Sequence, residues 1–316
     1  MTELLITRSN HLVDPYVHVW AWQIPVYLFL GGWVAGMMSL AGYFQWQGRH
    51  RDRQCTCVLT PWLGVVLLSL GMFALFLDLE HKRYFWRLYT TFEIASPMSW
   101  GAWILVVVYP ALLAAALVQP PQWLRRAVPA TEALASWLES RPALVRAVGL
   151  ASLVLGLALG IYTGILLSAL GARPLWSSAI LGPLFLLSGL SSAAAFVHLV
   201  ARRRDERVFL ARADNLFLML ELAAIVLFLI GLATATEAHK QAAGLLLGGP
   251  YTAVFWVGVV GLGIAVPLVV QSLAVRHRIQ HTPLGPIMVI AGGLALRFVI
   301  VYAGQVSHWA PQVAQF

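Results

Sequence analysis

The sequence predicts an all-α, polytopic membrane protein with eight transmembrane helices and both termini in the periplasm. Hydrophobic residues make up 60% of the 316 residues and charged residues only 11%. Apolar runs alternate with short polar loops, and each run approaches the roughly 20 residues that a helix needs to cross about 30 Å of hydrocarbon. Only helices and closed barrels satisfy their backbone groups in lipid, and these runs are too long and too uniformly apolar for barrel strands.

The first span includes Gly32 and Gly36, and the fourth carries Gly156, Gly160 and Gly164 at four-residue intervals. Such stripes of small residues let helix backbones approach closely in lipid, so we expect them to be packing surfaces. The longest loop, residues 119–146, is too short for a soluble domain, and the whole chain 1–316 is expected to form one transmembrane domain. The eight predicted spans are residues 19–44, 58–77, 99–118, 147–170, 175–200, 215–236, 253–275 and 284–303.

The orientation follows from the basic residues. The loops 45–57, 119–146, 201–214 and 276–283 carry 14 Lys and Arg residues, whereas the tails and the other loops carry 6. The positive-inside rule places the first set in the cytoplasm and both termini outside. The net charge of +8 is thereby explained as a topology signal with some affinity for anionic membrane lipids, and it does not indicate a nucleic-acid partner.

The start of the chain has no basic segment followed by an apolar core, so no cleavable signal peptide is expected. A first span that itself directs insertion is typical of a protein of the bacterial inner (cytoplasmic) membrane. We therefore expect a multi-pass protein of that membrane.

Metal chemistry within the chain is not expected. The two cysteines, Cys55 and Cys57, lie in a predicted cytoplasmic loop, where neither a metal cluster nor a disulfide is favoured. Of nine histidines, only His198 falls inside a span, whereas a haem held by two histidines needs facing ligands within the helices. The sequence thus predicts no haem, no iron–sulfur cluster and no other metal in this chain.

Polar residues gather near the predicted outer side of the spans. Ionisable and hydrogen-bonding groups are costly in apolar spans and are candidates for function. At 1.5 Å per residue, Tyr162 lies about 12 Å and Arg297 about 9 Å below the outer surface. The candidates are His18, Gln23, Tyr27, Asp78, Glu93, Tyr162, Arg297 and Gln305.

This set suits a quinone, whose flat ring needs hydrogen-bond donors at its two carbonyl oxygens and a proton acceptor for two-electron chemistry. His18, Asp78 and Tyr162 are the candidate catalytic residues. The cofactor-binding candidates are His18, Gln23, Tyr27, Tyr162, Arg297 and Gln305. Structural alternatives remain open: Tyr162 as a core tyrosine bonded to a neighbouring helix, His18 as an interfacial anchor, and Asp78 or Glu93 as a partner of Arg297 or Lys82.

A proton route from the cytoplasm is a further hypothesis. Glu221, about 9 Å inside the sixth span, and His198 in the fifth are its candidate members. Glu221 and Arg297 are expected to differ by about 11 Å in depth, too far for a direct pair without tilt. The alternative for Glu221 is a neutral carboxyl bonded to a neighbouring helix.

Several segments resemble the NrfD/PsrC family of membrane subunits, which includes those of polysulphide reductase and of the formate-dependent nitrite reductase pathway. The segments are IPVYLFLGGWVAG (24–36), LFLDLEHKRYFWRLY (75–89), SPMSWGAW (96–103), YTGILLSALGARPLW (162–176), LFLLSGLSSAAA (184–195), FWVGVVGLGIAVP (255–267) and LRFVIVYAGQ (296–305). They cover most of the chain in the order of the family.

The resemblance implies a subunit that reacts with menaquinone or ubiquinone near the periplasmic face. It also implies a periplasmic ferredoxin-like 4Fe-4S partner and, beyond that partner, a molybdopterin or multihaem catalytic subunit. By resemblance, His18 and Tyr162 are headgroup ligands and Glu93 is a docking residue. The segment after Asp78 reads Glu80-His81-Lys82, where members often carry a pattern that ends in Arg-Pro.

Two other classes of protein stay open at this point. A secondary transporter is suggested by the Gly- and Pro-containing spans, although the polar residues cluster near one face and no repeat is visible. A structural anchor without a quinone site is the other alternative. Binding of quinol analogues distinguishes the transporter and the structural anchor from a subunit that reacts with a quinone.

Overall fold

The computed structural model describes residues 20–52, 55–169, 171, 173–275 and 283–309, and this part of the chain is helical without strands. Eight of its helices are long and apolar enough to cross a membrane. They are α2 (Gln23–Trp46), α3 (Thr60–Asp78), α5 (Pro97–Leu117), α8 (Pro142–Ser168), α9 (Leu181–Val200), α10 (Arg204–Thr234), the π-helical η4 (Val254–Ala265) that continues as α12 (Val266–Val275), and α13 (Leu284–Val306). The predicted eight-span helical fold is confirmed, whereas the side on which the termini lie stays a prediction.

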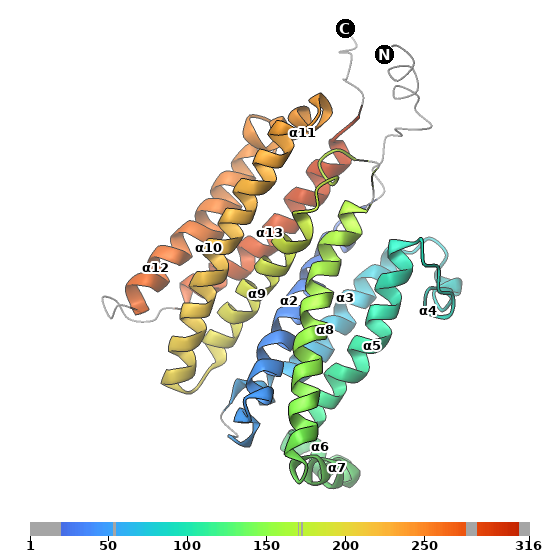
Figure 1. Cartoon of the computed structure of the whole chain (residues 1–316), viewed down its shortest axis with the longest axis vertical. Coiled ribbons are helices and arrows are strands. Elements are labelled where there is room, and N and C mark those ends of the chain that lie inside the picture. Colours follow the sequence, from blue (N-terminus) through green and yellow to red (C-terminus); the bar gives the residue numbers. More distant parts are fainter. Residues whose placement is uncertain (1–19, 53–54, 170, 172, 276–282, 310–316) are drawn as a thin grey trace.

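Short helices occupy the connections, where the sequence predicted loops. Helix α4 lies at one end of the bundle together with α11, and α6 and α7 lie at the opposite end (Figure 1). Proline begins several helices, including α3, α5, α7 and α8, because the first helical residue needs no backbone N–H partner. The short elements are η1 (Arg49–Arg51), η2 (Thr56–Val58), η3 (Lys82–Tyr84), α4 (Arg87–Thr90), α6 (Gln122–Ala127), α7 (Pro129–Glu139) and α11 (Glu237–Leu247).

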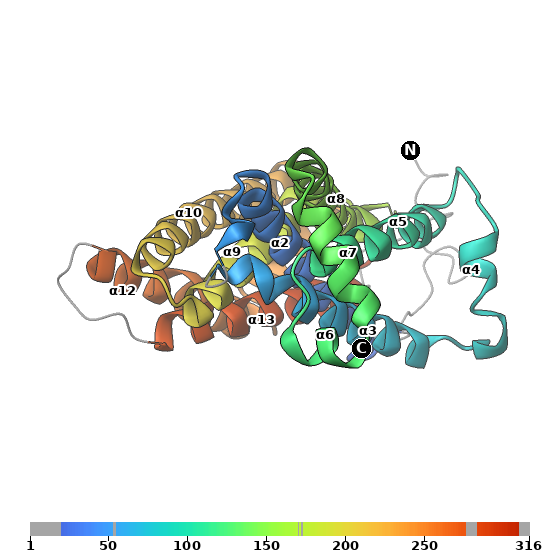
Figure 2. The ribbon, with the colours of Figure 1, turned by 90° about the horizontal axis from the view of Figure 1, so that it is seen from below.

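The spans form two groups of four. Helices α2, α3, α5 and α8 pack together, as do α9, α10, η4 with α12, and α13. The groups meet where α2 contacts α9 and α13 and where α8 contacts α9. Seen from below, α3 and α5 lie on one side of α2 and α9, and α10 and α12 lie on the other (Figure 2). Helix α2 is therefore the central element of the molecule.

Glycines allow the close contacts of α2. A Cβ added at Gly36 would lie 2.6 Å from the Cβ of Ala193 on α9, and one at Gly156 on α8 would lie 2.6 Å from the Ser39 hydroxyl. Real Cβ atoms do not approach other atoms so closely, so both positions need glycine. The predicted packing role of these small-residue stripes is confirmed.

The sixth span begins earlier than predicted. The sequence placed its start at residue 215, whereas α10 begins at Arg204 and carries Asp205 and Glu206 in its first turn. Acidic side chains near a helix N-terminus are favourable because they oppose the positive end of the macrodipole. Hydropathy reports only the part of a helix that lies in hydrocarbon, and the polar extension was therefore counted as a loop.

The expectation that the two cysteines are unpaired is wrong. Cys55 and Cys57 form a disulfide with Cα atoms 5.2 Å apart. Both residues are buried, and the turn between them is closed by a bond from the Cys57 N–H to the Cys55 sulfur at 3.3 Å. The sequence argument considered only the redox state of the compartment, whereas the turn itself brings the two sulfur atoms together.

Candidate functional site

A cavity of about 510 Å³ opens at the end of the bundle that carries α4. Its walls are the residues that follow α3, the short helices η3 and α4, and the first turn of α5. Aliphatic and aromatic side chains such as Leu79, Phe85 and Met98 form much of the lining. A largely apolar cavity of this size with a few polar groups is typical of a site for a small organic molecule.

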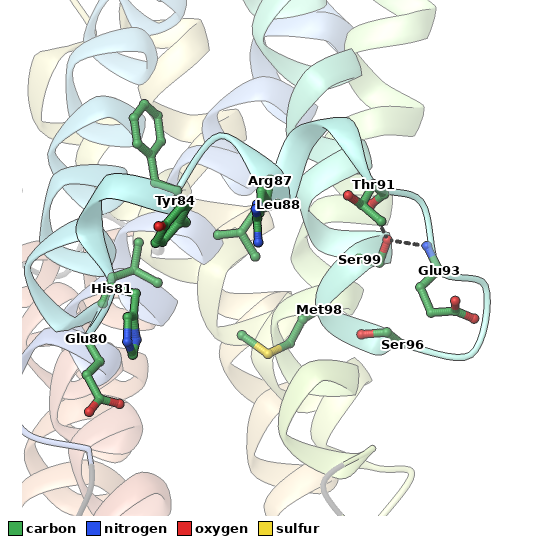
Figure 3. Close-up of a pocket in the computed structure, with 12 residues that line it drawn as sticks. Glu80, His81, Tyr84, Arg87, Leu88, Thr91, Glu93, Ser96, Met98 and Ser99 are labelled. Atoms are coloured by element: carbon green, nitrogen blue, oxygen red, sulfur yellow. Dashed lines mark hydrogen bonds between the residues drawn. The ribbon is translucent and has the colours of Figure 1, made fainter.

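The polar groups of this pocket come from two walls. Glu80 and His81 lie side by side below Tyr84, and Met98 faces them from the start of α5 (Figure 3). Arg87 adds a cation from α4. A neutral imidazole ring has one nitrogen that accepts and one that donates, so the pocket holds a hydrogen-bonding group, His81, that the sequence interpretation did not assign. The LDLEHKRYFW segment contained this signal, but only Asp78 was chosen from it.

The loop before α5 is fixed by one hydroxyl group. Ser99 Oγ accepts a hydrogen bond from the Glu93 N–H at 2.9 Å and donates one to the Thr91 carbonyl at 3.3 Å (Figure 3). Glu93 itself lines the pocket. The third-span residue Ser99 thereby holds the rim of the pocket against the first turn of α5.

Tyr162 lies behind the pocket, between α8 and α5. It is buried, and its hydroxyl donates a hydrogen bond to the Pro97 carbonyl at 2.9 Å. A Cβ added at Gly101 would overlap the phenol ring, at 2.6 Å from Cε1. This arrangement matches the alternative in which Tyr162 is bonded to a neighbouring helix. Because its proton is already donated, Tyr162 offers only oxygen lone pairs to a ligand.

Tyr27 joins the same region from α2. It is buried, packs against Gly71 on α3, and lies within electrostatic range of the phenol groups of Tyr162 and Tyr89. Burial raises the pKa of Tyr89, which lies on α4 outside the spans. Tyr27, Tyr89 and Tyr162 therefore lie near one another, although they come from α2, α4 and α8.

Asp78 and Gln23 are not among the residues that line the pocket. Asp78 is the last residue of α3 and is partly exposed, and the pocket lining begins with the next residue, Leu79. The Gln23 amide oxygen is buried and has no hydrogen-bond partner among the described residues. His18 lies outside the described residues.

Gln305 is bonded to the start of α2. Its amide donates to the Trp20 carbonyl at 2.9 Å and accepts from the Trp20 N–H at 3.1 Å. Trp20 in turn stacks on Trp176, with ring centroids 5.1 Å apart. The amide of Gln305 is thus engaged by the backbone, and it fixes the chain two residues after His18.

Arg297 belongs to a second polar group, on the side of α2 that faces α9 and α13. Its guanidinium donates to the Phe185 carbonyl at 2.8 Å and to the Gly293 carbonyl at 3.3 Å, and it lies 4.4 Å from the centroid of the Phe185 ring. Its charge interacts with Glu221, which accepts a hydrogen bond from Ser191 at 3.0 Å. The structure does not bring Arg297 to the Tyr162 group.

Glu221 and Arg297 interact electrostatically, and no ion pair joins the two side chains within the described part of the chain. The expected difference in depth between them stays a prediction.

Helix α10 carries two further buried acids that the sequence interpretation missed. Glu206, Asp214 and Glu221 are all buried, and their spacing of eight and seven residues places them on one face. Asp214 accepts a hydrogen bond from Gln271 on α12 at 2.8 Å. His198 is buried on α9. The periodicity of the acids would have revealed this stripe if the helix had been started at residue 204.

Fold and site together define a multi-pass helical membrane protein with a largely apolar pocket at one end and a line of buried acids in its second group of helices. The family model described as Polysulphide reductase, NrfD matches residues 10–308. The chain belongs to this family, which confirms the resemblance read from its motifs.

Individual relatives match over most of their length. The protein is 31% identical to a polysulfide reductase chain of Wolinella succinogenes, over 91% of its own sequence and 94% of that relative. It is 33% identical to protein NrfD of Escherichia coli, over 92% and 96%. It is 25% identical to a tetrathionate reductase subunit of Salmonella typhimurium, over 94% and 81%.

Proposed function

We propose that this protein is the membrane subunit of a respiratory reductase complex and exchanges electrons between a membrane quinone and an iron–sulfur partner. The observation that carries the proposal is the 510 Å³ pocket between α3, α4 and α5, in a protein whose relatives are named as parts of polysulfide and tetrathionate reductases. The pocket lies at the end of spanning helices, where a lipid-soluble ring can enter from the bilayer.

The chemistry of the pocket supports oxidation of a quinol. Each quinol releases two electrons and two protons, so the site needs groups that accept protons and pass them to water. His81 and Glu80 line the pocket and serve this purpose, with Asp78 beside them. His18 is proposed as the second headgroup ligand. Menaquinone and ubiquinone both fit this scheme.

Tyr162 is proposed to recognise the reduced ring. Its proton is donated to Pro97, and its lone pairs therefore suit a quinol hydroxyl better than a quinone carbonyl. Tyr27 supports Tyr162 from α2. The contribution of Gln305 is to hold the segment that follows His18, and Arg297 is assigned to the second polar group.

The rim of the pocket is proposed as the docking surface of the periplasmic ferredoxin-like 4Fe-4S subunit. Exposed apolar side chains, among them Trp86, Phe92 and Ile94, lie beside Glu93 on this rim. A partner on this surface would bring its nearest cluster close to the ring. Electrons would then pass to a molybdopterin or multihaem subunit. This assignment places the rim and both termini in the periplasm and the protein in the bacterial inner membrane.

Inhibitor binding tests the quinone site. The purified protein is titrated with a fluorescent hydroxyquinoline-N-oxide, for the native sequence and for His18→Ala, Tyr162→Phe and the control Tyr43→Phe at the opposite end. We expect saturable quenching that weakens in the first two variants and stays native in the control. A folded native protein without saturable quenching would favour the structural anchor or the transporter.

A proton route is a second proposal, favoured by the buried acids of α10. From the start of α10, the side chains of Glu206, Asp214 and Glu221 lie along one face of the helix and lead toward Ser191 and Arg297. Buried acids inside spans are costly and are candidates for proton transfer. His198 is a candidate at the entrance.

The ratio of protons to electrons in proteoliposomes tests this route. Glu221→Gln is expected to lower the ratio, and Glu132→Gln on the exposed face of α7 is expected to leave it unchanged. An unchanged ratio in the Glu221 variant, with native electron transfer, would remove the proposal.

A further inference from the structure

A second cavity lies at the other end of the bundle, where α2 ends and α10 begins. Its volume is about 340 Å³, and Arg49, Arg51 and Arg203 are among the residues that line it. The length of the spanning helices separates it from the pocket beside α4 (Figure 1). Its ligand is therefore independent of the proposed quinone.

Three arginines and three acidic residues, Asp52, Asp205 and Glu206, line this cavity, but they are not all paired with one another. Arg203 forms ion pairs with Asp52 and with Asp205, the latter at 3.1 Å. The buried Glu206 carboxylate accepts a hydrogen bond from the Thr56 N–H at 3.2 Å. Arg49 and Arg51 are exposed and make no ion pair within the described part of the chain. These two guanidinium groups therefore remain available to an anion.

The positive charge at this end of the bundle comes from the segments around the cavity. Segments 45–57 and 201–214 together carry eight arginines and four acidic residues, which leaves a net charge of +4. Clusters of arginine beside spanning helices attract anionic lipid headgroups. Arginine also suits phosphate groups because its planar fork can donate two parallel hydrogen bonds.

An aromatic ledge, formed by Phe44, Trp46 and Phe209, adjoins Arg49. The Arg49 guanidinium lies 5.3 Å from the centroid of the Phe44 ring, which packs on Phe209 with centroids 5.7 Å apart. Trp46 and Phe209 are 46% and 37% exposed. Aromatic side chains at the ends of spans lie at the level where headgroups meet acyl chains. A soluble anion has no apolar part that could pack against this ledge, whereas a lipid has one.

We propose that this cavity binds an anionic phospholipid. Arg49 and Arg51 hold the phosphate of the headgroup, and Trp46 and Phe209 contact the glycerol and the upper acyl chains. The cavity volume lies at the lower end of the range for small-molecule sites, which suits a headgroup whose chains remain in the bilayer.

The test is a lipid titration of the full-length protein in detergent, followed by native mass spectrometry. Phosphatidylglycerol and phosphatidylcholine are compared for the native protein, for Arg49→Gln/Arg51→Gln, and for Arg126→Gln/Arg146→Gln. The last variant removes two exposed arginines with the same change in charge. We expect the native protein to prefer phosphatidylglycerol and the pocket variant to lose roughly tenfold or more of that affinity, with the control close to native.

Three results would overturn the proposal. Equal losses in the pocket and control variants would indicate a diffuse charge effect, and equal binding of the two lipids would remove the anion site. Displacement of the lipid by millimolar inorganic phosphate would assign the cavity to a free anion. Arg49→Lys/Arg51→Lys keeps the charge and is expected to retain the preference, which separates loss of binding from loss of folding.

Discussion

Replacing Gly101 by alanine tests the contact between α5 and Tyr162. The added Cβ would lie 2.6 Å from Tyr162 Cε1, and overpacking of this kind costs about 1–3 kcal/mol. Loss of the bond from Tyr162 to the Pro97 carbonyl costs about 1 kcal/mol, whereas the helix propensity of alanine returns about 1 kcal/mol. The free energy of unfolding should therefore fall by about 1–3 kcal/mol.

The assay is chemical unfolding in detergent, read by tryptophan fluorescence, with Gly231→Ala as the matched control. A Cβ at Gly231 on α10 meets no atom within 4 Å, so this variant should gain up to about 1 kcal/mol. Gly101→Ala should also weaken inhibitor quenching as Tyr162→Phe does. If both glycine variants are equally stable, the close approach of Tyr162 to α5 is wrong.

Three further predictions concern the segment before α2, the second polar group and the buried acids of α10. Gln305→Leu removes two hydrogen bonds to Trp20 and should lower the free energy of unfolding by about 1–3 kcal/mol; a native melting temperature would contradict this. Arg297→Met removes two hydrogen bonds to the Phe185 and Gly293 carbonyls and the charge that interacts with Glu221, and it should cost about 1–3 kcal/mol. The additional variant Glu221→Gln should recover part of this loss, and additive losses in the double variant would refute the coupling. Asp214→Asn keeps a hydrogen-bond acceptor at its position and should change the free energy by less than about 1 kcal/mol, as measured by the same unfolding titration.

The spans were predictable because every backbone N–H and C=O group in lipid must be hydrogen-bonded within the protein. The glycines of α2 and α8 were predictable for a related reason, since close approach in a membrane requires small residues. Helix ends were less accessible to prediction. Hydropathy falls at the membrane surface whether the helix stops or continues, and α10 continues.

The site was predicted in part. Tyr27 and Tyr162 do interact electrostatically, but no sequence pattern could reveal that the hydroxyl of Tyr162 donates its proton to the Pro97 carbonyl. Arg297 was grouped with them from depth alone, and depth does not say on which side of a helix bundle a residue lies. His81 was overlooked because the fold of the connection between α3 and α5, which forms the pocket, depends on tertiary packing.

The burial of α2 has a consequence for the biogenesis of the protein. Of the eight described spans, α2 is synthesised first and has the lowest mean hydropathy, and its most apolar stretch is 83% buried in the finished molecule. Its neighbours α8, α9 and α13 are synthesised later. The glycine surface of α2 is therefore exposed to lipid until these helices have been inserted. Chains truncated before α13 are expected to be substrates for membrane quality-control proteases.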